Sequence, residues 1–441
     1  MGRQPSGHAV PVLHLAQELC LGGCCRDMEN LASLATKDVF VPVLAGLRGD
    51  LGYLSELRAR GFRAAVTGED LKGLPDLLGG ESRFAVVVHR SGEQNHLWNS
   101  VFLILRQVGA AVIIERNIFG YVDKGPAANL RDLTFFNSLH TMWKHWTASG
   151  KPSLDGYIGN YWVIHSAVTA SPPSDELSTS RQRIRDKLGI GPDAFVIGHI
   201  TRSDPVRLDY MSVAILPRLV RELPNLQFLA RSFPSSLAKD ASKRLGGRFQ
   251  NLPPTTNPVE MIETYSAMDT LVHFSSMGES FGMAIAEAMY YGLPVVTNET
   301  PGFQQGNAQR ELVIHGKTGF LANDPVSVVK RLVELAHSPE LRQKMGEAGR
   351  ARFLTGPLAP QTIIGQLEGI IARIAHEKDW GIPGIPPLTE RQPSDEQMRE
   401  YLLNYKSSYT VAPLPRNLQE TVWNGKVDLQ RFFWRVRRKF L

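Results

Sequence analysis

The feature that most constrains the fold is the segment GESFGMAIAEAMYYGLPVV at residues 278–296. An apolar, strand-like run (Thr270–Phe274) leads into it through a loop of small residues. The pattern then predicts a helix over Phe281–Tyr291 with Ser280 as its N-cap, ended by a Gly-Leu-Pro triplet. Val295–Thr297 is typical of the next buried strand. The segment therefore predicts a β-loop-α-β unit, the building block of parallel sheets with helices on their faces.

The predicted unit carries two carboxylates, Glu279 and Glu287, which are eight positions apart in the sequence. At about 100° per residue, Glu287 falls away from the apolar stripe formed by Phe281, Ile285, Ala288 and Met289. Its side chain leans toward the helix N-terminus, where free backbone amides attract phosphate. Because carboxylates accept hydrogen bonds from hydroxyls, the segment suits a nucleotide that carries a polyhydroxylated group.

The same residues resemble the E-x(7)-E signature of the retaining glycosyltransferases of family 4, which have the GT-B fold. Glu279 with the Ser-Phe-Gly that follows it, Glu287, and the GLPVV stretch carry the resemblance. Downstream, TPGF at 300–303 and ELVIHGKTGFL at 311–321 are similar to the family's next conserved pattern. The resemblance implies an α/β chain of the GT-B class, with two Rossmann-like doubly wound domains facing a cleft. The alternative is an ordinary α/β unit with surface carboxylates.

Length and alternation agree with two domains. A chain of 441 residues is too long for one ordinary core, and strand-like and helix-like segments alternate in both halves. Low apolar content and a Pro-Pro pair make 166–180 the predicted linker. We expect an acceptor-side domain at 1–170, a nucleotide-sugar (donor) domain at 181–356, and a helical extension with a basic tail at 357–441.

The expected strands are short and apolar. They are Val10–Leu15, Val39–Leu44, Arg63–Val66, Phe84–His89, Ala110–Ile114 and Tyr161–His165 in the first half, and Phe195–Ile200, Gln227–Ala230, Phe249–Leu252, Thr270–Phe274 and Val295–Thr297 in the second.

Composition excludes several classes of protein. The net charge is +6, but six Lys/Arg against one Asp from Trp423 onward give the tail +5 of it. The rest is nearly neutral, so we expect no nucleic-acid partner. No apolar run approaches the roughly 20 residues that span a bilayer. Three cysteines offer no disulfide framework, which favours a cytoplasmic location.

Two arginines follow the strand Phe195–Ile200. Arg202 and Arg207 resemble the family's G-R-x-x-x-x-K turn, with Arg207 where lysine is usual. Two cations here could balance the leaving diphosphate without a metal, so no metal site is expected. The alternative is two solvated loop arginines.

The first half offers fewer candidates. Gly22 and Gly23 follow the first strand, where a glycine-rich turn of the resembling family approaches the donor phosphate or the acceptor. No G-x-G-x-x-G fingerprint follows, so no dinucleotide cofactor is expected. His89, at the end of FAVVVH, is the candidate catalytic histidine, although such a residue is often structural. The family's usual histidine after the AAVII-like strand is replaced by Glu115–Asn117.

The resemblance implies sugar transfer from a nucleotide diphosphate-sugar to an acceptor hydroxyl with retention of configuration, in glycan or glycolipid biosynthesis. Glu287 would hold the ribose, and Glu279 would address the donor sugar together with the amides of Ser280, Phe281 and Gly282. The acceptor would be a glycan or a lipid-linked saccharide. Two alternatives stay open on the same fold: a nucleotide-sugar epimerase that uses His89 and Glu93, and a non-catalytic nucleotide-sugar-binding scaffold.

The C-terminal residues 428–441 have the pattern of a basic amphipathic helix. Their apolar residues recur at helical spacing, namely Leu429, Phe432, Phe433, Val436 and Phe440. The basic residues lie away from that stripe, namely Arg431, Arg435, Arg438 and Lys439. Such a helix either lies on an anionic membrane at its cytoplasmic face or packs on the protein's own first domain.

Overall fold

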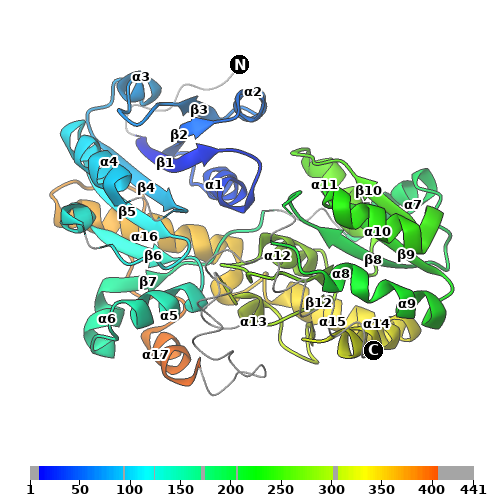
Figure 1. Cartoon of the computed structure of the whole chain (residues 1–441). Coiled ribbons are helices and arrows are strands. Elements are labelled where there is room, and N and C mark those ends of the chain that lie inside the picture. Colours follow the sequence, from blue (N-terminus) through cyan, green and yellow to red (C-terminus); the bar gives the residue numbers. More distant parts are fainter. Residues whose placement is uncertain are drawn as a thin grey trace. The chain divides into compact units, whose positions relative to one another are not determined.

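The structure, a computed structural model, describes residues 9–92, 95–123, 125–169, 174–204, 207–300 and 306–405. These residues form two compact units (Figure 1). The first contains the described residues up to Thr169 and those from Phe353 onward, and the second contains those between Ala170 and Arg352. The predicted tail helix lies outside the described residues, as does Glu93.

The first unit is built on a seven-stranded sheet in which every neighbouring pair is parallel. Its strands are β1 (Val10–Leu19), β2 (Phe40–Gly49), β3 (Arg63–Val66), β4 (Phe84–Arg90), β5 (Ala110–Asn117), β6 (Leu133–Phe136) and β7 (Tyr161–Val163). They run in the order β3-β2-β1-β4-β5-β6-β7 across the sheet.

Helices cover both faces of this sheet. They are α1 (Gly23–Leu34), α2 (Leu51–Ala59), α3 (Leu74–Leu77), α4 (Asn95–Gln107), η1 (Pro126–Leu130), α5 (Leu139–Ala148), α6 (Leu154–Asn160), η3 (Gly356–Leu358), α16 (Pro360–Glu377) and α17 (Asp395–Asn404). All seven residues of β4 are buried, because both of its faces are covered. Alternate β4 residues pack on opposite sides: Ala85 and Val87 belong to the core with α16, and Val86 and Val88 belong to the core with α4.

The second unit repeats the plan with six parallel strands in the order β10-β9-β8-β11-β12-β13. They are β8 (Phe195–Ile200), β9 (Leu226–Arg231), β10 (Phe249–Leu252), β11 (Thr270–His273), β12 (Val295–Thr297) and β13 (Gly319–Leu321). Its helices are α7 (Ser174–Lys187), α8 (Met211–Ala214), α9 (Leu216–Glu222), α10 (Ser235–Leu245), η2 (Gly246–Arg248), α11 (Pro258–Ala267), α12 (Met283–Tyr290), α13 (Gln309–Leu312), α14 (Pro325–His337) and α15 (Pro339–Ala351).

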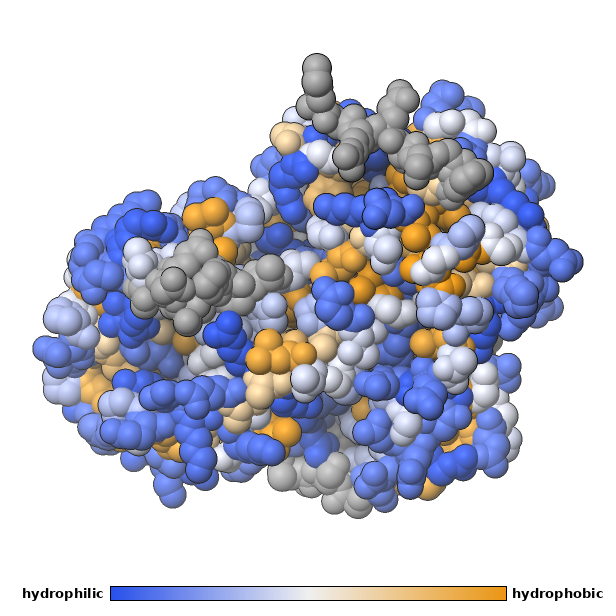
Figure 2. All heavy atoms as spheres, turned by 180° about the vertical axis from the view of Figure 1, so that it is seen from behind, coloured by the Kyte–Doolittle hydropathy of each residue, from blue (hydrophilic) through white to orange (hydrophobic). Residues whose placement is uncertain are grey.

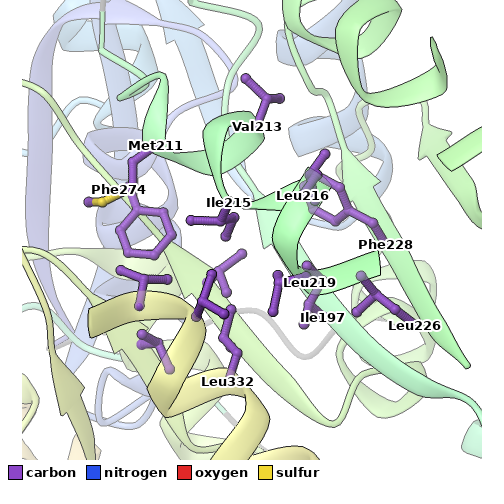
Figure 3. Close-up of a cluster of buried hydrophobic side chains, with 14 of the residues drawn as sticks. Ile197, Met211, Val213, Ile215, Leu216, Leu219, Leu226, Phe228, Phe274 and Leu332 are labelled. Carbon is purple, nitrogen blue, oxygen red and sulfur yellow. The ribbon is translucent and has the colours of Figure 1, made fainter. Parts of the chain in front are cut away.

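One core of the second unit lies between the sheet and helices α8, α9, α10 and α14 (Figure 3). Ile197, Leu216 and Leu332 point toward one another there, from β8, α9 and α14. Helices α11 and α12 contact α7, β11 and β12 outside this core. On the face seen in Figure 2, hydrophilic residues predominate. No helix in the described ranges is long and apolar enough to cross a membrane.

The expectation of two parallel, doubly wound domains is confirmed. Strands β3, β8, β10 and β12 have the predicted bounds. The strand β6 was not predicted, and residues 174–180 of the expected linker form the start of α7. Helices α8 and α9 are separate, because Pro217 has no N–H to continue the ladder from one to the other. The described residues from 357 onward, expected as an extension, pack within the first unit as η3, α16 and α17.

Candidate functional site

In the second unit, the loop after β8 lies against the loop after β11. Leu208 and Ser275 form an antiparallel bridge. The backbone N–H of Ser276 donates to the carbonyl oxygen of Arg207 at 2.9 Å, and its hydroxyl donates to the same oxygen at 3.2 Å. Both loops follow carboxyl ends of parallel strands, where ligands bind in open α/β sheets. The pairing therefore brings Arg207 to the loop that carries Glu279.

The backbone of the Glu279 loop is held very closely to residues 306–309. A Cβ on Gly278 would overlap the carbonyl oxygen of Gly306, and a Cβ on Gly306 would overlap the backbone of Glu279. The N–H of Glu279 donates to Oε1 of Gln309 at 3.1 Å, and its carbonyl accepts from the N–H of Ala308 at 2.9 Å. The position of Glu279 is thus fixed by backbone contacts that only glycine at 278 and 306 allows.

The Glu279 side chain is the accessible carboxylate of this site, with 28% of its surface exposed. Its Oε1 lies 3.0 Å from Nε2 of His273, the last residue of β11. Burial alone would raise the pKa of Glu279, but the hydrogen bond from His273 and the charges of Arg207 and Arg202 hold it below its ordinary value. Glu279 is therefore a carboxylate at neutral pH. The charges of Arg202 and Arg207 thus act on this carboxylate.

Arg207 is itself paired with Asp204, whose Oδ2 lies 3.3 Å from its Nε. About a third of the Arg207 side chain remains exposed, at 34%, and Arg202 is exposed. Both guanidinium groups can therefore reach a ligand from solvent.

Glu287 lies on α12 and is partly buried. Its Oε2 accepts a hydrogen bond of 2.6 Å from the hydroxyl of Tyr265 on α11. The Tyr265 ring stacks on Tyr291 at 5.0 Å, which fixes the hydroxyl in place. The carboxylate is thus oriented from one side.

The start of α12 differs from the prediction. Gly282, at a positive φ of 99°, is the N-cap, and no side chain caps the helix. The expected N-cap, Ser280, therefore lies two residues too early, because the residue before this helix is in the left-handed conformation that favours glycine. Phe281 is buried, whereas Ser280 is partly exposed. The first amides of α12 have no carbonyl partner within the helix.

In the first unit, His89 is the residue before the last in β4 and is fully buried. Its Nε2 lies 3.1 Å from Nδ1 of His14 on β1. Burial lowers the pKa of both rings, and the charge of Arg116 lowers both further. His14 also lowers the pKa of His89, and the pKa of His14 itself falls to about 3. Both rings are therefore neutral. His89 exposes no surface, and its catalytic role stays a prediction.

Arg116, one of the three residues Glu115–Asn117 at the place where the resembling family has a histidine, is part of a buried ion pair. β5 extends through Asn117, so this residue lies in the strand rather than after it. Its Nη2 lies 2.8 Å from Oδ2 of Asp27 on α1 and 2.9 Å from the hydroxyl of Ser166. Asp27 also accepts from the N–H of Ala167 at 3.0 Å. The cluster ties α1 to the segment that follows β7.

Glu115 points to a second buried cluster, in which two acids balance two arginines. It pairs with Arg90 at 3.5 Å and with Arg131, and Asp123 lies 3.4 Å from each of those arginines.

Gly22 is the extended N-cap of α1, and Gly23 begins the helix. The predicted glycine turn thus stands at the junction of β1 and α1, at the same edge of the sheet as His89.

Sequence reasoning brought together Arg202, Arg207 and Glu279 but missed the groups that orient the two carboxylates. His273 belongs to a segment that was predicted as a strand, and Tyr265 lies on helix α11. A histidine that ends an apolar strand just before the Glu279 loop was a signal that could have been used. No sequence pattern relates Tyr265 to a carboxylate 22 residues later.

Part of the second unit is similar to a known protein family. Residues 232–352 match the family model described as Glycosyl transferases group 1. Trehalose synthase from Pyrococcus horikoshii is 23% identical over 217 residues, which are 45% of this chain and 51% of that protein. D-inositol 3-phosphate glycosyltransferase from Pseudarthrobacter chlorophenolicus is 26% identical over 243 residues, 52% of this chain and 56% of that protein. The chain spans about half the length of these curated relatives.

A solved structure extends the similarity to both units. The crystal structure of Alr3699/HepE from Anabaena, in complex with UDP and glucose, has a TM-score of 0.62 at 16% identity. The match covers 82% of this chain and 98% of that chain. The fold is that of the GT-B glycosyltransferases. The matched segment contains Glu279, Glu287, Tyr265 and His273, whereas Arg202 and Arg207 precede it.

Proposed function

We propose that this protein is a retaining glycosyltransferase of family 4 that moves a sugar from a nucleotide diphosphate-sugar to an acceptor hydroxyl. The observation that carries the proposal is the grouping of an accessible carboxylate, Glu279, with the cations Arg202 and Arg207. A nucleotide diphosphate-sugar has the complementary parts, hydroxyls and a diphosphate. The match of the surrounding segment to the group 1 glycosyltransferases supports the same assignment.

In this proposal each residue acts on one part of the donor. Glu287 accepts from the ribose hydroxyls, and Glu279 accepts from hydroxyls of the transferred sugar. Arg202, Arg207 and the first amides of α12 stabilise the negative charge of the diphosphate as it leaves. These cations supply the charge that a metal provides in other transferases, so the proposed reaction is metal-independent.

Retention follows from attack on the same face that the diphosphate leaves. The bond between the anomeric carbon and the diphosphate oxygen breaks, and the acceptor oxygen bonds to that carbon. The acceptor proton passes to an oxygen of the leaving diphosphate. A protein base is therefore not required, which agrees with the buried, neutral state of His89.

The names of the similar proteins suggest substrates to test first. The Anabaena protein was crystallised with UDP and glucose, so UDP-sugars are the first donors to try. We propose a glycan or lipid-linked saccharide as acceptor.

The decisive experiment incubates the protein with a panel of UDP-, GDP- and ADP-sugars and measures nucleotide release. Release of the nucleotide from one donor, increased by an acceptor, supports the transferase. Interconversion of two donors would show an epimerase, and tight binding without either reaction would show a scaffold.

We further propose that residues 428–441 contact an anionic membrane on the cytoplasmic side. The support is the sequence pattern alone, an aromatic stripe with basic residues away from it. Each basic residue near such a surface contributes about 1 kcal/mol. The full-length protein should therefore sediment with vesicles that contain phosphatidylserine, and less so as salt is raised.

Truncation before Trp423 provides the comparison for this binding. The truncated protein should stay folded and lose the vesicles. If the full-length protein ignores the vesicles, or if truncation lowers the melting temperature strongly, the tail packs on the protein instead.

A further inference from the structure

The imidazole of His273 stands directly behind Glu279. His273 ends β11, a strand in the interior of the second sheet that pairs with β8 and β12. Its carbonyl oxygen accepts a hydrogen bond of 2.6 Å from the hydroxyl of Thr297 on β12. Only 10% of its side chain is exposed, whereas 28% of the Glu279 side chain is. A ligand that reaches Glu279 therefore meets the carboxylate first, with the histidine beneath it.

The hydrogen bond between the two side chains has one direction. Oε1 of Glu279 lies 3.0 Å from Nε2 of His273. A carboxylate can only accept, so Nε2 carries the proton and donates it to this bond. Nδ1 of His273 has no partner in the part of the chain that the structure describes.

A second histidine holds the ring from its other side. The His199 ring, on β8, lies parallel to that of His273, with 5.7 Å between ring centroids and 5° between planes. His199 is fully buried. Burial and the neighbouring His273 lower its pKa to about 3, so it stays neutral. The ring of His273 is thus confined between a neutral, flat neighbour and the carboxylate that it contacts.

The other carboxylate oxygen remains available. Within the described residues, Oε2 of Glu279 has no hydrogen-bond partner, and it is not buried. One oxygen is therefore held by the protein while the other can accept from a ligand. This division of roles is what a group needs if it is to contact a sugar hydroxyl in a fixed geometry.

We propose that His273 is a positioning residue of the donor site, which orients the Glu279 carboxylate toward the transferred sugar through its Nε2–H. This inference rests on the proposed function for its effect on turnover, but the hydrogen bond itself can be tested without any donor.

Two substitutions separate the hydrogen bond that His273 donates from the packing of its ring. His273→Phe keeps a flat ring on His199 but has no N–H. His273→Gln loses the ring but can present an amide N–H near the position of Nε2. The matched control is His337→Asn, an exposed histidine in the last turn of α14 in the same unit. Thermal melting of each variant shows whether it is folded.

The first readout is the pKa of Glu279, measured by an NMR titration of protein labelled with ¹³C at the glutamate carboxyls. The Glu279→Gln variant assigns the Glu279 signal. The groups that face this carboxylate are His273 from β11, His199 behind it on β8, and Arg202 and Arg207 from the loop after β8. Loss of a donor disfavours the charged form, so His273→Phe should raise the pKa of Glu279. His273→Gln and His337→Asn should leave it close to the wild-type value.

The second readout is nucleotide release from the donor that the wild-type protein uses. A hydrogen bond to a charged group corresponds to a change of roughly ten- to hundred-fold. His273→Phe should lose that much kcat/KM, mainly in kcat, while its affinity for the free nucleotide stays unchanged. His273→Gln should recover most of the loss.

The outcomes are distinct. Unchanged Glu279 titration in His273→Phe, or equal loss in the Phe and Gln variants, would overturn the positioning role. A wild-type protein that turns over no donor would overturn the proposed function, and the carboxyl titration would still decide whether His273 holds Glu279.

Discussion

For Arg202, the proposed function predicts a specific effect on the binding of a nucleoside diphosphate. Arg202 follows β8, its charge lowers the pKa of Glu279, and it is exposed. If it contacts the diphosphate, Arg202→Ala should weaken binding of a nucleoside diphosphate by about 1.5–3 kcal/mol. Binding of the bare nucleoside should not change. Isothermal titration calorimetry with UDP and uridine measures both.

The control for this prediction is Arg218→Ala, which removes an exposed arginine paired with Glu222 on α9. It should affect neither ligand, because a surface pair of this kind contributes little. Equal weakening of UDP and uridine by Arg202→Ala would count against a phosphate contact.

Glu287 makes a different prediction, since its partner is a tyrosine and not a cation. Glu287→Ala should lose most affinity for the nucleotide while the protein stays folded, because the ribose acceptor is gone. Glu279→Ala should mainly lower turnover. Equilibrium binding of nucleotide and single-turnover kinetics distinguish the two effects, with the exposed Glu334→Ala on α14 as control. Two variants that bind and react like the wild type would refute the site.

These site residues could be predicted from the sequence to different extents. Glu279, Glu287 and Arg202 could be found because their spacing follows from one helix and two strand ends. The orienting groups could not be found in the same way: His273 and Tyr265 meet their carboxylates across separate elements, so only tertiary packing creates the contact. The burial of Arg116 was equally hidden, because its partner Asp27 is 89 positions away in the chain.

At the scale of elements, the loop that carries Glu279 depends on two glycines. Gly278 has a φ of 73°, and both Gly278 and Gly306 face backbone atoms at the place where a Cβ would stand. Gly306→Ala should therefore lower the free energy of unfolding by about 1–3 kcal/mol through overpacking. It should also displace Glu279 and reduce turnover. Urea unfolding and nucleotide release measure the two effects.

Gly365→Ala is the matched control for this change. Gly365 is exposed in α16, and no atom lies within 4 Å of the place of its Cβ. This substitution should raise stability slightly, because alanine is the better helix former. A Gly306→Ala protein as stable and active as the wild type would show that the loop can rearrange at little cost.

Elements were predictable where the apolar pattern was strong and uninterrupted. The runs FAVVVH and FVIGHI gave strands close to β4 and β8. The strand β6 was missed because its four residues, LTFF, follow charged and polar residues that suggest a loop. The start of α12 was missed because a glycine in the left-handed conformation, and not a serine, precedes the helix. Local preference decides a cap only when the chain approaches in extended form.

At the scale of the whole molecule, buried neutral histidines set the response to acid. Burial lowers the pKa of His14 and His199 from 6.5 to about 3, that of His145 to about 4, and that of His89 well below 6.5. Below about pH 6.5 the unfolded chain binds protons at these positions and the folded chain does not. As the pH is lowered below about 6.5, the free energy of unfolding should therefore decrease, by about 1.4 kcal/mol per pH unit for each histidine.

Urea unfolding at a series of pH values between 7.5 and 5 tests this slope. His199→Phe removes one of the four groups and should make the dependence on pH shallower by about one proton. The exposed His337→Asn should leave the slope unchanged. Stability that is constant between pH 7.5 and 5 would show that these rings are charged in the folded protein.

The first unit is discontinuous in the chain, and this has a consequence for its synthesis. Ile363, Ile370 and Ile374 of α16 cover a sheet whose last strand ends at Val163. A ribosome that adds about 5–20 residues per second takes on the order of ten to forty seconds to travel between them. During that time the described residues of the second unit, which all precede Phe353, can fold, while one apolar face of the first sheet lacks its cover by α16. A nascent chain that stops at residue 352 exposes that face permanently, so premature termination there produces a species with the surface that chaperones bind.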